Sequence, residues 1–270
     1  MSDDSVRVDP ATLRLQGAPN FRAVGALPAA DQRRLSPGWI WRSDALHRLD
    51  DADLAQLERL SIRTVIDLRR EDERRLMPTR WPQGQTRTTR VFDEAPDALQ
   101  VVQAGGWRMA LETPDFDAQA ARGWMLETYR RMPAALAPAV RDAAHALVTS
   151  VTIPQSVLVH CTAGKDRTGF VIALLLCALD VPWEAILEDY LETTRRTPPE
   201  WLAEALIGKL GLADNTRVRG AVETIAGVEA DYLEAARQTL LVQHPSTAAY
   251  LDAIGVDATV RAALQAALLD

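Results

Sequence analysis

Short apolar runs with β-strand composition alternate along this chain with longer stretches in which apolar residues recur at helical spacing. Between the first two runs, residues 49–54 open a helix in which Leu54, Leu57 and Leu60 supply the apolar stripe. Alternating strand and helix signals predict an α/β fold. The predicted strands lie within 38–44 and at 62–68, 87–92 and 156–160.

The second half of the chain reads as helices, with Ser246 and Asp257 as natural N-caps for the last two. Residues 18–27, near the start, look irregular. No internal repeat or low-complexity tract interrupts the pattern, so we expect a single domain spanning 1–270 with a helical C-terminal half. The other predicted helices are 134–148, 169–179, 183–195, 199–210 and 230–243.

The segment 93–132 differs from its surroundings, since it combines prolines and a Gly-Gly pair with helical pieces. Thr113-Pro114 is a plausible cap and first turn, followed by apolar residues at helical spacing up to Met132. One interpretation is surface helices packed on the core. The other is a mobile lid above an active site, because Trp107, Met109, Trp124 and Met125 offer more apolar surface than a connector needs.

Composition narrows the classes of function. The net charge of −7 argues against nucleic acid as the main partner. The acidic start of the chain lacks the pattern of a secretory signal, and the longest apolar run, 170–179, is about half the length that crosses a bilayer. We therefore expect a cytoplasmic protein without membrane insertion, although export without a signal peptide would leave no trace in the sequence.

The two cysteines, Cys161 and Cys177, are expected to be free thiols. Such low usage suits a reducing compartment, and Cys177 lies in the middle of a predicted helix, which disfavours a bridge between them. Cysteines and histidines do not occur at zinc-ligand spacing. We expect neither a metal nor a cofactor.

The stretch VLVHCTAGKDRTGF joins a predicted strand to a predicted helix through a tight turn, Cys161 to Arg167. Such a turn points successive backbone N–H groups into one concavity, and the helix N-terminus adds partial positive charge. Gly164 lets the chain wrap closely, while the fork of Arg167 can hold two phosphate oxygens. The turn therefore predicts an anion site.

Cys161 stands at the front of this turn, where the field that binds a phosphate dianion also stabilises a thiolate. In-line attack on phosphorus would give a covalent cysteinyl-phosphate and expel an alcohol or phenol. Thr168 could donate its hydroxyl to the sulfur, and His160 could brace the turn through its ring nitrogens. The candidate substrate-binding residues are His160, Thr162, Ala163, Gly164, Lys165 and Thr168.

Other cysteine- or glycine-containing loops fit less well. A nucleotide-binding P-loop needs a glycine five residues before Gly164 and Ser or Thr after Lys165, and neither is present. A rhodanese-like sulfurtransferase loop lacks the His-Cys…Arg-Thr frame. A plain core thiol would not need these neighbours.

At HCTAGKDRTG the sequence resembles the cysteine-dependent protein tyrosine phosphatases, and more narrowly the bacterial branch typified by mycobacterial protein tyrosine phosphatase B. The likeness covers nearly the whole chain. Ala23 departs from it, where an aspartate is usual, and so does Ser61, where glycine is usual. Further motifs that carry the resemblance are Asn20-Phe21-Arg22, Trp41-Arg42-Ser43-Asp44-Ala45-Leu46, Val65-Ile66-Asp67-Leu68-Arg69, Tyr129-Arg130, Asp189-Tyr190-Leu191 and Glu229-Ala230-Asp231-Tyr232-Leu233.

The resemblance implies a central sheet flanked by helices and a helical lid, which we place at about 93–132. It implies Cys161 as nucleophile, Arg167 as phosphate clamp and an acid that protonates the leaving oxygen. Asp166 in the turn and Asp93 after the strand 87–92 compete for that role; we favour Asp166 and keep Asp93.

The resemblance further implies that Lys165 adds positive charge at the rim of the site, a feature that accompanies activity on phosphoinositides as well as phosphotyrosine and, less readily, phosphoserine or phosphothreonine. Asp67 and Arg69 are expected to brace the sheet end. The predicted function is a metal-independent protein tyrosine phosphatase that acts on a phosphorylated protein or phosphoinositide and releases inorganic phosphate. The alternatives are an inositol-phosphate phosphatase and a catalytically silent phosphate-binding module.

Overall fold

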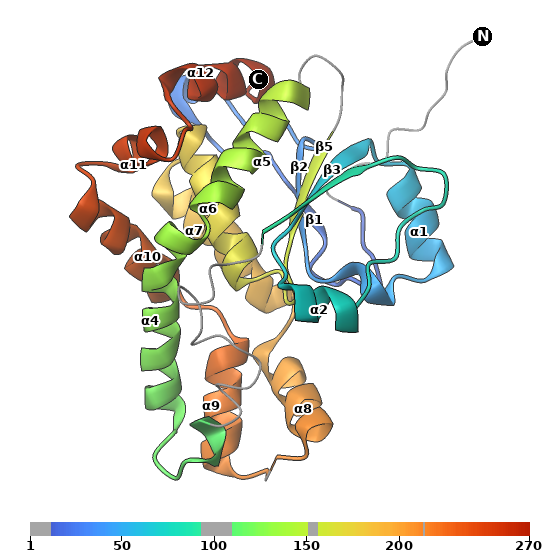
Figure 1. Cartoon of the computed structure of the whole chain (residues 1–270), viewed down its shortest axis with the longest axis vertical. Coiled ribbons are helices and arrows are strands. Elements are labelled where there is room, and N and C mark those ends of the chain that lie inside the picture. Colours follow the sequence, from blue (N-terminus) through green and yellow to red (C-terminus); the bar gives the residue numbers. More distant parts are fainter. Residues whose placement is uncertain (1–11, 93–109, 151–155, 213) are drawn as a thin grey trace.

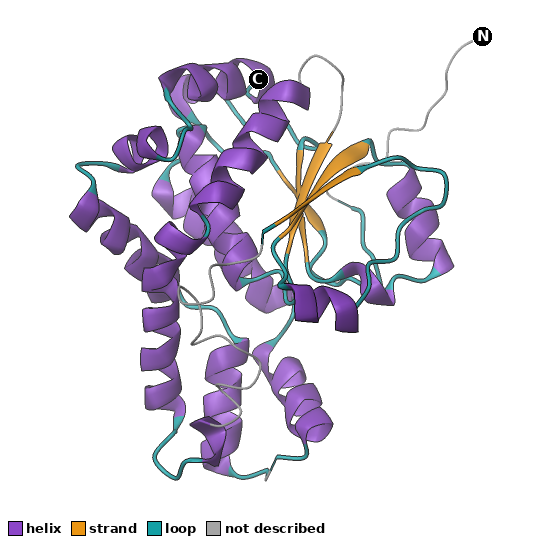
Figure 2. Cartoon of the chain, viewed as in Figure 1, coloured by secondary structure: helices purple, strands orange, loops and turns teal. Residues whose placement is uncertain are grey.

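A five-stranded sheet lies at the centre of the protein, in a computed structural model that describes residues 12–92, 110–150, 156–212 and 214–270 (Figures 1 and 2). The strand order is β1-β2-β5-β3-β4, with β1 antiparallel to β2 and the remaining neighbours parallel. This arrangement confirms the α/β class. The strands are β1 Arg22–Val24, β2 Ile40–Ser43, β3 Ile62–Asp67, β4 Thr88–Val91 and β5 Ser156–His160.

Strand β5 is the middle strand and is buried along its whole length, as its uninterrupted apolar run predicts. At its carboxyl end His160 pairs in register with Ser43 of β2 and with Asp67 of β3. The chain therefore leaves three parallel strands at the same edge of the sheet, which is where open α/β sheets bind their ligands.

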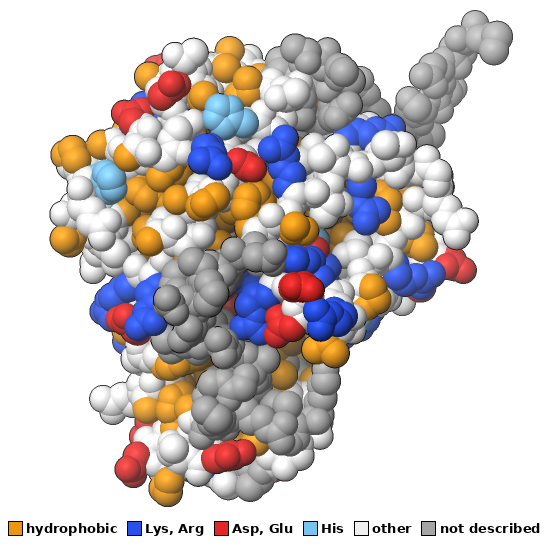
Figure 3. Space-filling model, viewed as in Figure 1, with side chains coloured by type: hydrophobic (Ala, Val, Ile, Leu, Met, Phe, Trp, Pro, Cys, Tyr) orange, Lys and Arg blue, Asp and Glu red, His pale blue; other side chains and the backbone are white. Residues whose placement is uncertain are grey.

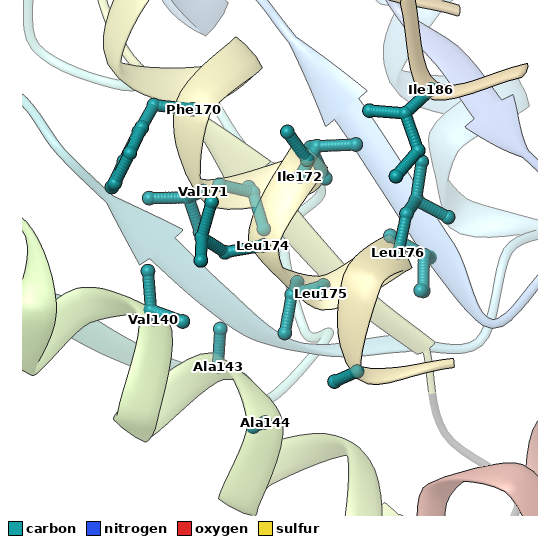
Figure 4. Close-up of a cluster of buried hydrophobic side chains, with 14 of the residues drawn as sticks. Val140, Ala143, Ala144, Phe170, Val171, Ile172, Leu174, Leu175, Leu176 and Ile186 are labelled. Atoms are coloured by element: carbon teal, nitrogen blue, oxygen red, sulfur yellow. The ribbon is translucent and has the colours of Figure 1, made fainter. Parts of the chain in front are cut away.

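Helices cover both faces of the sheet. Helices α5 (Ala137–Ser150) and α6 (Asp166–Ala178) pack on the face to which Val157 and Val159 point. Leu158 points to the opposite face, towards the core that contains Leu57 of α1 (Asp51–Glu58). In Figure 4, Val140, Ala143 and Ala144 of α5 face α6. Such small side chains let the two helices approach closely.

The remaining helices continue the fold towards the C-terminus. Two short 3₁₀ helices and α2 lie in the connections between the first four strands, and the longer helices come after β4. Their bounds are η1 Ala30–Gln32, η2 Leu46–Arg48, α2 Glu71–Leu76, α4 Ala118–Ala135, α7 Trp183–Arg196, α8 Pro199–Leu210, α9 Thr216–Ala226, α10 Ala230–Gln243, α11 Thr247–Ala253 and α12 Ala258–Leu268. Among the described residues, no helix has the length and hydropathy to cross a membrane.

Helices α8 and α9 extend away from the sheet; α9 packs against the first half of α4, and α8 packs on α9 (Figure 1). They share a small apolar core that is separate from the two cores beside the sheet. This core consists of Leu111, Ala121, Ala203, Ile207, Val218, Ala221 and Val222.

Several predicted boundaries need correction. Strand β1 and helices α2 and α9 were not expected from the pattern. Helix α4 begins at Ala118, because the side chain of Asp117 accepts the N–H of Ala120, and not at Thr113-Pro114. The caps at Ser246 and Asp257 are confirmed, since each side chain accepts a backbone N–H of the first turn.

The segment 93–132 is described from residue 110 onwards, so Trp107 and Met109 lie outside the described residues. Its helical spacing is confirmed within α4, where Met125, Tyr129 and Met132 are buried in the core beside α5 and α6. Trp124 packs against the same core. That the segment acts as a lid stays a prediction.

Candidate active site

The turn between β5 and α6 curls around the sulfur of Cys161. The backbone N–H of Gly164 donates to Cys161 Sγ at 3.2 Å, and the cysteine is 2% exposed. Gly164 has φ of +68°, and a Cβ on it would come within 2.5 Å of the backbone nitrogen of Asp44. Glycine is therefore required for the turn to close against the chain that follows β2.

Helix α6 begins at Asp166, directly after this turn. The first N–H groups of a helix have no partner within it, and together with the helix dipole they favour an anion nearby. The helix itself is fixed by its buried side chains, which include Phe170, Val171 and Ile172. A rigid helix end thus faces the loop that holds Cys161.

Arg167 lies in the first turn of α6, and Glu73 of α2 holds its guanidinium. Nη1 and Nη2 donate to the two carboxylate oxygens of Glu73 at 2.8 Å each, and Nη1 also donates to the carbonyl of Leu68 at 2.9 Å. The hydroxyl of Thr162 donates to the same carboxylate. Burial alone would raise the pKa of Glu73, but the hydrogen bonds and charge of Arg167 outweigh it and lower the pKa to about 2. The pair fixes the plane of the guanidinium beside the loop.

His160 lies behind the loop and is fully buried. Burial lowers the pKa of His160 to about 4, although Asp67 opposes this shift, so the ring is neutral. Its Nδ1 lies 3.3 Å from the carbonyl of Cys161 and donates to it, as expected for a residue that braces the loop. Thr168 differs from expectation, because its buried hydroxyl has no hydrogen-bond partner among the described residues and makes no bond to Cys161.

Asp67 and Arg69 brace the end of β3, as the sequence predicts. Arg69 Nε and Nη2 donate to the two oxygens of Asp67 at 2.9 and 2.7 Å, and Nη1 donates to the carbonyl of Met77 at 2.6 Å. Burial alone would raise the pKa of Asp67, but the hydrogen bonds and charge of Arg69 outweigh it and lower the pKa. Leu68 lies between these two residues, so the pair fixes the position of the Leu68 carbonyl that accepts from Arg167.

Lys165 does not stand at the rim of the site, which corrects the expectation for this residue. Its side chain is 7% exposed, and Nζ donates to the carbonyls of Ile225 and Gly227 at 2.5 and 3.0 Å. These carbonyls lie at the C-terminus of α9, the end of a helix that attracts a cation. In this arrangement Lys165 ties the loop to α9.

Asp166 presents a carboxylate next to Arg167, with 23% of its side chain exposed. Its Oδ1 accepts the hydroxyl of Tyr129 at 2.7 Å and the ammonium of Lys165 at 3.2 Å. Asp93, the other candidate acid, lies outside the described residues. Strand β4, which precedes it, ends at Val91 in register with Asp67, at the same edge of the sheet.

A buried polar network supports the loop from behind. Arg42, fully buried, donates from Nη2 to the carbonyl of Gly164 at 3.1 Å and from Nη1 to Asp189 at 2.5 Å. The side-chain amide of Asn20 also donates to the carbonyl of Gly164, at 2.9 Å. Burial would raise the pKa of Asp189, but Arg42 and Arg22 outweigh it and lower the pKa.

The sequence pattern predicts no role for Glu73, Tyr129 or the members of this network. The available signal was that Asn20, Arg42 and Asp189 each stand in one of the family-like motifs, beside apolar residues. Figure 3 shows acidic and basic side chains gathered in the middle of the drawn face, between areas of hydrophobic side chains.

The second cysteine is unsuited to the same chemistry. Both thiols are free, but burial raises the pKa of Cys177 to about 12, so it stays protonated. In the described part of the chain, no three His, Cys, Asp or Glu side chains are grouped so that they could hold a metal ion.

Comparison with known proteins agrees with these observations. A family model described as "Tyrosine phosphatase family" matches residues 13–270. The triple specificity protein phosphatase PtpB of Mycobacterium tuberculosis is 34% identical over 91% of this chain and 95% of its own length. A putative tyrosine-protein phosphatase of Cupriavidus necator is 33% identical over 88% of this chain and 82% of its own. The crystal structure of P. aeruginosa TpbA, 18% identical, gives a TM-score of 0.32 over 78% of this chain and 96% of that one.

Proposed function

The chain belongs to the tyrosine phosphatase family, and from that premise we propose that it hydrolyses phosphotyrosine through a cysteinyl-phosphate on Cys161, without a metal. The observation that carries the proposal is the loop itself. The backbone nitrogen of Gly164 lies 3.2 Å from the sulfur of Cys161 and donates to it. Helix α6 begins two residues after Gly164, with Asp166 and Arg167.

The first step is attack of the Cys161 thiolate on phosphorus. The P–S bond forms while the bond from phosphorus to the phenolic oxygen breaks, and that oxygen takes a proton from an acid. The N–H groups at the start of α6 and the guanidinium of Arg167 stabilise the equatorial phosphate oxygens. We assign the acid to Asp166, which lies in the same helical turn as Arg167, and keep Asp93 as the alternative.

The second step releases phosphate. Water attacks the cysteinyl-phosphate, the P–S bond breaks, and the deprotonated Asp166 takes the proton from the water. Inorganic phosphate leaves and the thiolate is restored. Glu73 acts on Arg167 in both steps, because its two oxygens fix the orientation of the guanidinium.

The proposal extends to substrates other than phosphotyrosine. The mycobacterial relative carries the name "triple specificity protein phosphatase". We propose that this chain acts on phosphoserine, phosphothreonine and phosphoinositides as well, more slowly than on phosphotyrosine. Support from Lys165 is weaker than its sequence position implies, since its ammonium is bound to α9.

The test compares phosphate release from phosphotyrosine, phosphoserine and phosphothreonine peptides, phosphoinositide micelles and soluble inositol phosphates. We expect the phosphotyrosine peptide to be the best substrate and EDTA to have no effect. Cys161→Ser should lower turnover by at least about a thousandfold with the melting temperature unchanged. Turnover retained in that variant would refute the covalent route.

Two other results would replace the proposal with one of its alternatives. Preference for soluble inositol phosphates would indicate an inositol-phosphate phosphatase. Phosphate binding by the intact protein without turnover of any substrate would indicate a silent binding module.

A further inference from the structure

Two tyrosines and an aspartate from three different helices meet beside the phosphate loop. The hydroxyl of Tyr129 on α4 lies 2.7 Å from Asp166 Oδ1 and 2.6 Å from the hydroxyl of Tyr190 on α7. Both tyrosine side chains are buried. In the sequence both tyrosines stand in motifs that carry the family resemblance, and neither takes part in the two proposed steps of hydrolysis.

The hydrogen bonds in this chain of groups have one direction. A phenol carries a single proton, and an ionised carboxylate can only accept. Tyr129 therefore donates to Asp166 and accepts from Tyr190. Burial, with the nearby charge of Asp166, raises the pKa of both tyrosines well above its usual value, so both remain donors.

Packing holds the two hydroxyls in place. The ring of Tyr190 lies against Gly169 of α6, where a Cβ would come within 2.8 Å of the ring. The ring of Tyr129 contacts the ring of Tyr190 edge to face, with 6.4 Å between the ring centroids. It also packs at a tilt against the ring of Tyr232, with 5.6 Å between the centroids. Helix α6 also carries Asp166. The contacts of Tyr190 with α6 and with Tyr129 therefore hold the Tyr129 hydroxyl in a fixed position relative to the Asp166 carboxylate.

Within the described ranges of the chain, Oδ1 is the carboxylate oxygen of Asp166 that receives hydrogen bonds. Tyr129 and Lys165 both donate to Oδ1, and among the described residues no hydrogen bond ends at Oδ2. A carboxylic acid that accepts two donors at Oδ1 keeps its own proton on Oδ2. Oδ2 is then the oxygen that can hand a proton to a leaving group.

We propose that Tyr129, backed by Tyr190, is a positioning residue that orients Asp166 so that Oδ2 protonates the leaving oxygen. This inference rests on the role proposed above for Asp166. Tyr129 itself is buried and acts through the carboxyl group, so its loss should affect proton delivery and not substrate binding.

The test is Tyr129→Phe, which keeps the ring and removes the hydroxyl. The measurement is kcat/KM for a series of aryl phosphates whose leaving phenols differ in pKa, because only a poor leaving group needs the acid. We expect a loss of about 10- to 100-fold for phenyl phosphate and a much smaller loss for p-nitrophenyl phosphate. Affinity for inorganic phosphate should be unchanged.

Three further variants make the result specific. Asp166→Asn should show the same leaving-group dependence, and adding Tyr129→Phe to it should cause no further loss. Tyr250→Phe is the matched control, since Tyr250 is also buried but donates to the carbonyl of Pro133 at 2.7 Å. It should leave the leaving-group dependence unchanged.

An equal loss for all aryl phosphates in Tyr129→Phe would overturn the proposal in favour of a structural role. If Asp166→Asn shows no leaving-group dependence while Cys161→Ser is inactive, the positioning role fails and the phosphatase function stands. Should Tyr129→Phe not fold, Tyr190→Phe decides, because it removes the donor to Tyr129 and must likewise lower kcat/KM more for phenyl phosphate than for p-nitrophenyl phosphate; no change in the leaving-group dependence there would contradict the proposal.

Discussion

Gly164 imposes a steric requirement on the loop that other residue types do not meet. Its φ of +68° lies in the left-handed region, and the space where a Cβ would stand is taken by the backbone of Ser43 and Asp44. Backbone on one side and the Cys161 sulfur on the other leave no room for relaxation. The residue therefore links the shape of the loop to the position of the nucleophile.

Gly164→Ala should lower the free energy of unfolding by at least about 2 kcal/mol and abolish most of the activity, because the loop must move away from β2. Urea unfolding and aryl phosphate hydrolysis measure the two effects. Gly123→Ala in α4 is the matched control, since a Cβ there meets nothing within 4 Å. It should be neutral or stabilising by up to about 1 kcal/mol; equal effects in both variants would contradict the steric explanation.

Asp44 gives a prediction about pH. Burial raises the pKa of Asp44 to about 7, against the lowering effect of backbone hydrogen bonds. Between about pH 4 and pH 7 the folded protein keeps a proton that the unfolded chain releases, so this group stabilises the fold at pH 4 and loses that contribution as the pH rises.

Asp44→Asn removes this titration. Between pH 7 and pH 4 the unsubstituted protein should gain roughly 3 kcal/mol of unfolding free energy from this group, and the variant should not. Urea unfolding of both proteins at both pH values measures the difference. A stability difference between the two proteins that does not change with pH would show that Asp44 is ionised in the fold.

At the scale of elements, Lys165 joins the phosphate loop to the end of α9. Its ammonium donates hydrogen bonds to two carbonyls at that end, those of Ile225 and Gly227. Helix α9 otherwise packs on α4 and α8 around their separate small core. The contact therefore couples a helix of the outlying group to the loop that carries Cys161.

Lys165→Met should loosen the end of α9, because the methionine keeps an apolar stem but cannot donate to the carbonyls. Amide hydrogen exchange in Thr216–Ala226 should become about tenfold faster. Arg219→Met is the control, since Arg219 pairs with Asp214 on the exposed side of α9. Unchanged exchange in the lysine variant, or the same change in both variants, would contradict the coupling.

Elements with a strong apolar pattern were predictable from the sequence, and elements without one were not. Strand β5 and helix α6 follow from the apolar runs on either side of Cys161. Helix α2 has the sequence EDERRL, with no apolar stripe, and lies where its polar side chains meet the loop. Helix α9 contains Gly220, which lowers its helical signal, and is held by packing on α4.

At the scale of the whole molecule, the sheet assembles the site from distant parts of the chain. Because β2, β5 and β3 are parallel with aligned ends, the residues that follow them converge on one edge. The loop from Cys161 to Arg167 was predictable because its residues are contiguous. The contacts of Arg42, Glu73 and Tyr129 with it depend on tertiary packing that no local pattern encodes.

The net charge of the molecule bears on how this edge of the sheet can bind an anion. The chain carries a net charge of −7, yet the proposed substrate is a dianion. The positive potential must therefore be local, and the end of α6 with Arg167 supplies it within the reach of a hydrogen bond.

The most direct test is to trap the covalent intermediate. The protein is mixed with a phosphotyrosine peptide, quenched in acid during turnover, digested and examined by mass spectrometry. We expect one phosphoryl group on Cys161 that disappears once the substrate is consumed, and none in Cys161→Ala. Turnover without any phosphorylated Cys161, or a phosphoryl group on another side chain, would contradict the assignment of this cysteine as the nucleophile.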